Sequence, residues 1–128
     1  MPYHAEDELG YSIPVPQPAA PPVPPLSAAG AFSFERLGCS REFSQVGGAL
    51  QNCLAELPGF FAGETVLAVR CAGAPVAAVQ LHGQRVVQAL AARNRPIDPG
   101  SPLDRAVRDW AALYGLRLPA PEEPDLIG

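Results

Sequence analysis

The spacing of apolar residues predicts two helices, one in the middle of the chain and one near its end. Between Ser40 or Ser44 and Leu57, apolar residues recur at helical spacing, and either serine is a suitable N-cap. The second helix begins after Ser101, an N-cap that proline follows, and ends near Gly115, a suitable C-terminal cap. The apolar face of the first helix comprises Val46, Leu50, Cys53, Leu54 and Leu57, and that of the second comprises Leu103, Val107, Trp110, Ala111 and Tyr114.

The segment between the two helices predicts three strands, over Thr65–Cys71, Pro75–His82 and Arg85–Leu90. Short links that contain glycine join the strands and favour hairpins. Within the first strand, residues of odd and even number face opposite sides of the sheet. We predict an α+β domain in which this small three-stranded antiparallel meander packs one face against the two helices.

The N-terminal part of the chain is rich in proline and poor in large apolar residues. Eight of the 16 prolines lie before residue 26, where they favour an extended polyproline II conformation. Such a segment buries too little apolar surface to offset the entropy lost on ordering it. The pattern predicts a disordered proline-rich arm over residues 1–30, a domain over residues 31–118 with Ala31–Leu37 as an extended lead-in, and an acidic proline-rich tail over residues 119–128.

The charges are divided between the core of the chain and its ends. All nine basic residues are arginine and lie between residues 36 and 117, whereas both ends are acidic. The formal net charge is −4 at pH 7. Acidic ends on a mildly basic core argue against strong DNA binding, which needs a clustered positive field. They allow the ends to cover a basic surface of the domain or to dock on a basic partner.

The cysteines and the N-terminal sequence predict a cytoplasmic protein. Cys39, Cys53 and Cys71 lack the paired spacing of a disulfide framework. No basic region followed by an apolar run marks a signal peptide, and no stretch approaches the roughly 20 apolar residues of a membrane span. We expect a reducing compartment and no contact with a membrane.

Cys53 is a weak candidate for a catalytic nucleophile. A reactive cysteine needs a base or a positive field nearby, and His82 is the only histidine of the predicted domain. The alternative is a small core residue on the apolar face of the first helix. Because close Cys-x-x-Cys and His-x-x-x-His spacings are missing, as is a glycine-rich phosphate loop, we predict no metal and no cofactor.

Polar and basic residues around the third strand supply most of the candidate binding set. Gln88 and Asn94 serve either partner recognition or the backbone of the following loop. The arginines would add a basic surface, which is a weak signal for single-stranded nucleic acid because no aromatic residues are interleaved with them. The candidate binding residues are Gln88, Asn94, Asn52, Arg70, Arg93 and Arg95.

A series of short motifs runs from the first predicted helix to the last. They are Gly47-x-x-Leu50-x-Asn52-Cys53-Leu54, Gly63, Arg70, Pro75-Val76-Ala77, Val86-Val87-Gln88, Asn94 and Trp110. Their order and spacing over residues 42–117 resemble the core of the PcfJ-like family, which is found on conjugative plasmids, phages and other mobile elements. The family's glutamate, histidine and glycine correspond here to Val46, Asn52 and Ala91. The resemblance implies a degenerate copy that binds a partner instead of catalysing a reaction.

The residues and the resemblance together favour a non-enzymatic accessory or inhibitor protein of a plasmid or phage. Such a protein would bind a protein partner through the proline-rich arm and one face of the domain. A counter-defence protein, such as an inhibitor of a CRISPR complex, belongs to this class. Two alternatives stay open: a nucleic-acid-associated accessory factor in plasmid or phage DNA processing, and a cysteine-dependent enzyme that uses Cys53.

Overall fold

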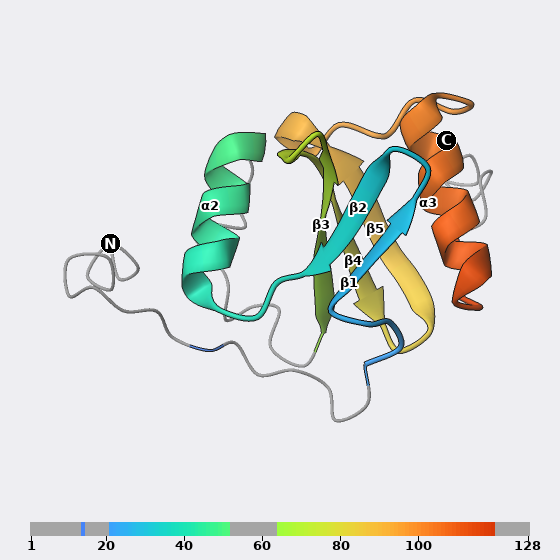
Figure 1. Cartoon of the computed structure of the whole chain (residues 1–128), viewed down its shortest axis with the longest axis horizontal. Helices are drawn as coiled ribbons and strands as arrows, with labels where there is room; N and C mark the ends of the chain where they lie inside the picture. Colours follow the sequence, from blue (N-terminus) through green and yellow to red (C-terminus); the bar gives the residue numbers. More distant parts are fainter. Residues whose placement is uncertain (1–13, 15–20, 52–63, 120–128) are drawn as a thin grey trace, which may run out of the picture.

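A five-stranded antiparallel sheet forms the centre of the computed structural model, which describes residues 14, 21–51 and 64–119 (Figure 1). Each strand pairs with its neighbours along the chain, so the spatial order β1-β2-β3-β4-β5 follows the sequence. No helix within these ranges is long and apolar enough to cross a membrane. The strands are β1 (Leu26–Ala29), β2 (Phe32–Arg36), β3 (Thr65–Cys71), β4 (Ala74–His82) and β5 (Arg85–Ala91), and the helical elements are α2 (Ser40–Leu50), the short 3₁₀ segment η3 (Ala92–Asn94) and α3 (Pro102–Leu113).

The prediction of a three-stranded meander is wrong, because two further strands extend the sheet. The predicted strands correspond to β3, β4 and β5, whereas β2 lies in the expected lead-in and β1 in the stretch expected to be disordered. β1 pairs with β2 along its whole length, so the expectation of disorder is wrong for residues 26–29. A short strand of Leu, Ser and Ala has little strand propensity, and its pairing decides its structure. Within the predicted arm, residues 1–13 and 15–20 lie outside the described residues, as does the predicted end of the first helix.

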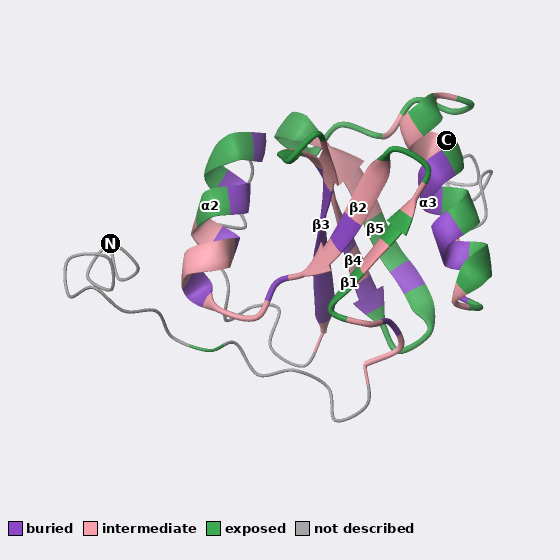
Figure 2. Ribbon diagram, viewed as in Figure 1, coloured by how far each residue is buried: buried purple, intermediate pink, exposed green. Residues whose placement is uncertain are grey.

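The two helices lie on opposite faces of the sheet, not on one face as predicted (Figure 1). β3 passes through the centre, and its residues Thr65 to Val69 are buried (Figure 2). Val66 and Ala68 pack with α2, whereas Leu67 and Val69 pack with α3. The alternation predicted for this strand is confirmed. A strand that is apolar at both odd and even positions needs cover on both faces, which one layer of helices cannot supply.

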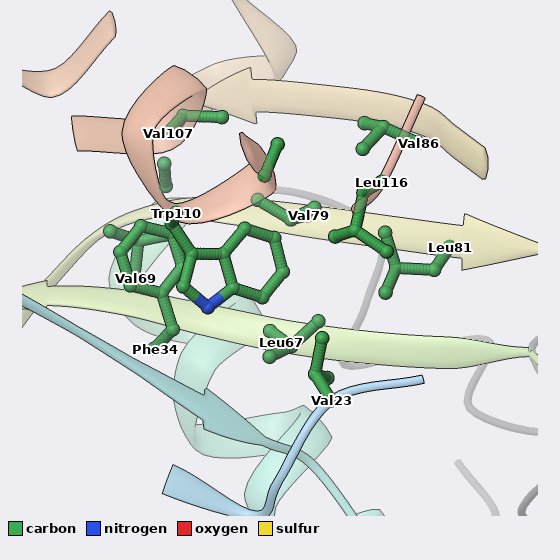
Figure 3. Close-up of a cluster of buried hydrophobic side chains, with 12 residues drawn as sticks. Val23, Phe34, Leu67, Val69, Val79, Leu81, Val86, Val107, Trp110 and Leu116 are labelled. Carbon is green, nitrogen blue, oxygen red and sulfur yellow. The ribbon is translucent and has the colours of Figure 1, made fainter. Parts of the chain in front are cut away.

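Trp110 is fully buried at the centre of the core on the α3 side (Figure 3). Its ring stacks on Phe34 with 4.5 Å between the ring centroids and an interplanar angle of 4°. Its indole Nε1 donates a hydrogen bond of 2.9 Å to Oγ of Ser27, which belongs to β1. Val23, just before β1, is only 4% exposed and packs in the same cluster. The segment around β1 is thus part of the domain core.

The predicted start of the last helix is confirmed, since α3 begins at Pro102 with Ser101 as its N-cap. Oγ of Ser101 accepts a hydrogen bond of 3.1 Å from the backbone N of Asp104. In return, the Asp104 carboxylate accepts one of 2.9 Å from the backbone N of Gly100. That hydrogen bond, together with the neighbouring Arg108 guanidinium, lowers the pKa of Asp104 from its ordinary value of 3.8. The charged carboxylate therefore stabilises the helix N-terminus.

Replacing Asp104 by Asn is expected to lower the free energy of unfolding by about 0.5–1 kcal/mol at neutral pH, because Asn keeps the shape but lacks the charge. The folded-state pKa lies below the unfolded value, so the contribution is present above the unfolded pKa and is lost as the pH falls through the folded-state pKa. Urea unfolding from neutral to acidic pH should show the difference from the wild type shrinking in acid. The control is Asp109→Asn, which removes the same charge from an exposed position in mid-helix. Equal effects of the two variants would contradict this account.

Candidate functional site

Two apolar cavities lie on either side of Pro96 and Ile97, which line both of them. The larger, of about 500 Å³, lies at the end of the sheet where β3 and β5 finish, and the smaller, of about 310 Å³, lies between β5 and α3. We call the two cavities together the Ile97 groove. Besides Pro96 and Ile97, the larger cavity is lined by Phe32, Cys71, Val76, Ala91, Arg95, Asp98, Ser101, Pro102 and Leu103, and the smaller by Val86, Ala89, Leu90, Asp104, Val107, Arg108, Leu118 and Pro119.

A left-handed turn after β5 brings the Pro96–Ile97 segment back beside the end of β5. Arg93 and Asn94 have positive φ angles of 60° and 58°. The backbone N of Arg95 donates a hydrogen bond of 3.2 Å to O of Ala92, and O of Arg95 accepts one of 2.7 Å from the backbone N of Ala91. Positive φ at two consecutive residues is the requirement of a type I′ turn, which reverses the chain. The reversal pairs Pro96 with Leu90 of β5. Because asparagine tolerates positive φ well, the position of Asn94 supports the backbone role that the sequence left open.

Charged side chains border the apolar lining of the Ile97 groove. Arg95 and Asp98 line the larger cavity, and Asp104 and Arg108, which form an ion pair of 3.1 Å, line the smaller. Arg95 is exposed, and no side-chain ion pair or hydrogen bond joins its guanidinium to another residue in the described part of the chain. A carboxylate of a bound molecule could therefore pair with it without displacing an internal partner.

Of the five candidate binding residues that the structure describes, Arg95 alone lines the Ile97 groove, and the others do not gather around it. Nε of Arg70 lies 3.0 Å from Oε1 of Glu35, on β2. Nε of Arg93 donates a hydrogen bond of 2.7 Å to Oε1 of Gln51, at the end of α2. Gln88 is exposed on β5. Two of the predicted arginines thus hold neighbouring elements together.

Of the residues that bear on cysteine chemistry, Cys71 and His82 lie in the described part of the chain and are far apart. Cys53 and Asn52 lie outside the described residues. Nδ1 of His82, whose side chain is 67% exposed, lies 2.7 Å from Oε2 of Glu64. Cys71 pairs with the first residue of β4 and His82 is the last, so the two lie about 25 Å apart along the strand. Within residues 21–51 and 64–119, no three His, Cys, Asp or Glu side chains are grouped as a metal site requires.

The Ile97 groove is absent from the sequence-based prediction because its lining comes from strands, a loop and a helix that are distant along the chain. One local signal points to it. Ile97 is a large apolar residue inside an otherwise polar loop, between Pro96 and Pro99. Such a residue indicates contact with the core, and Ile97 does pack against the α3-side cluster.

Comparison of the chain with protein-family models, with curated proteins and with solved structures finds no match. The likeness to the PcfJ-like family consequently depends on the motifs of the sequence alone.

Proposed function

We propose that the chain is a non-enzymatic protein-binding accessory or inhibitor protein whose partner binds in the Ile97 groove. The observation that supports this proposal is the open apolar lining of the groove, bordered by Arg95, Asp98 and the Asp104–Arg108 pair. Protein interfaces combine an apolar centre with a polar rim, and large side chains of one partner fill pockets of the other. The two cavities are of a size that accepts such side chains.

The sequence predicts that the partner binds one face of the domain, and in this proposal that face is the Ile97 groove. The arm has a narrower role than the sequence suggested, because Val23 and β1 are part of the core. The plasmid or phage setting, counter-defence included, is part of the proposal only through the resemblance to the PcfJ-like family.

Photo-crosslinking with the full chain tests the proposal. A photoreactive amino acid in place of Arg95, at the groove, is expected to crosslink one protein in host lysate. The same amino acid in place of Arg105, which is exposed on α3 and lines no part of the groove, is the matched control and should not capture that protein.

Charge reversal then measures how much the groove contributes to binding of the identified partner. Arg95→Glu is expected to weaken binding about tenfold, which corresponds to about 1.4 kcal/mol, while Arg105→Glu leaves the affinity unchanged. Titration calorimetry gives both values. Equal effects of the two variants would remove the groove from the proposal, and the absence of any crosslinked protein would remove the protein-binding function itself.

A further inference from the structure

The two outer edges of the sheet differ in how their backbone groups are satisfied. On the edge of β5, the backbone N of Val86 donates a hydrogen bond of 2.8 Å to O of Arg117, and that of Ala91 donates one of 2.7 Å to O of Arg95. For β1, at the opposite edge, the structure gives β2 as the one pairing partner among the described residues. An edge strand with unpaired N–H and C=O groups is a template for another strand.

Antiparallel pairing determines which backbone groups of β1 point outward. The backbone N of Arg36 donates a hydrogen bond of 2.9 Å to O of Pro25, so these two residues form a hydrogen-bonded pair. Hydrogen-bonded and non-hydrogen-bonded pairs alternate along an antiparallel ladder. In the register of β1 with β2, Leu26 and Ala28 occupy non-hydrogen-bonded positions, and their N–H and C=O groups point away from β2. Both side chains are exposed, and that of Leu26 is 65% exposed.

We propose that this edge binds β1 of a second copy of the chain, in a two-fold symmetric antiparallel pair centred on Ser27. In this register Leu26 of each copy lies opposite Ala28 of the other, and their outward N–H and C=O groups form hydrogen-bonded pairs. The large exposed leucine packs over the small alanine. The strand is therefore complementary to itself in side-chain size as well as in hydrogen bonding.

The residues around β1 allow this pairing and favour a partner strand as short as β1 itself. Pro25, which lacks an N–H, falls opposite Ala29 of the second copy, at a non-hydrogen-bonded position where no donor is needed. The stretch from residue 21 to residue 34 contains no charged residue, so no like charges meet within the strand pair. The prolines before β1 and the turn at Gly30 limit the ladder between the two copies to the pairs of Leu26 with Ala28. Since the interface is small, the dimer forms only at high protein concentration.

Sedimentation equilibrium of the full chain over a wide range of concentration is expected to give a reversible monomer–dimer equilibrium. Ala28→Pro removes an outward N–H that the ladder with β2 does not use, so this variant should stay monomeric at every concentration while keeping its circular dichroism. Ala28→Ser, which keeps the N–H, is the matched control and should dimerise as the wild type does.

Leu26→Lys provides a second variant in case Ala28→Pro fails to fold. In the monomer the lysine side chain is exposed to solvent, whereas in the dimer it would lie against the neighbouring copy. This variant is therefore also expected to be monomeric. A wild-type chain that remains monomeric at the highest concentration would overturn the proposal. So would dimerisation of Leu26→Lys, or of a folded Ala28→Pro, with wild-type affinity.

Discussion

Deletion of residues 1–30 is expected to unfold the domain, whereas deletion of residues 1–20 is expected to leave it folded. The longer deletion removes Val23, whose burial contributes about 1.5 kcal/mol, and Ser27, without which the buried indole N–H of Trp110 loses about 1–3 kcal/mol. It also removes β1 and thereby uncovers β2. Together these losses approach the whole stability of a small domain, which starts at about 5 kcal/mol.

Urea unfolding followed by the fluorescence of Trp110, the only tryptophan, measures the effect of each deletion. The shorter deletion is the control, because it retains Val23 and all of β1 and removes, among the described contacts, the bridge between Pro14 and Cys39. A disordered arm up to residue 30 would make the two deletions equivalent. Equal unfolding midpoints for the two truncated chains would therefore contradict the described core.

Replacement of Trp110 by Ala is expected to lower the free energy of unfolding by about 3–5 kcal/mol. The substitution leaves a cavity beneath α3, removes the stacking on Phe34 and leaves the hydroxyl of Ser27 without its donor. Trp110→Phe keeps an aromatic ring against Phe34 but loses the hydrogen bond, so its effect should be intermediate. Circular dichroism during urea unfolding gives the free energy of unfolding of the wild type and of both variants.

Leu113→Ala is the matched control for Trp110→Ala, because Leu113 lies on the same helix with 67% of its surface exposed. Its replacement should change the stability by no more than about 0.5 kcal/mol. If Trp110→Ala were as mild as Leu113→Ala, Trp110 would not be the centre of this core.

The elements that could be predicted from the sequence are those whose signals are local. Ser101 and Pro102 mark the start of α3 because capping depends on the adjacent turn alone, and the structure has the predicted hydrogen bond. β3 to β5 lie where glycine-containing links separate strand-forming segments, and the alternation within β3 was predicted correctly. These features follow from residues that are neighbours in the chain.

Three features depend on contacts between distant parts of the chain and were not predicted: β1 and β2 complete the sheet, one helix covers each face, and Pro96 and Ile97 divide a groove. β1 illustrates why. Its residues have little strand propensity, and it is held by pairing with β2 and by the hydrogen bond from Trp110 to Ser27, two residues 83 positions apart. No local pattern encodes such a contact. The same holds for the Ile97 groove, whose lining side chains meet only after the sheet and α3 have packed together.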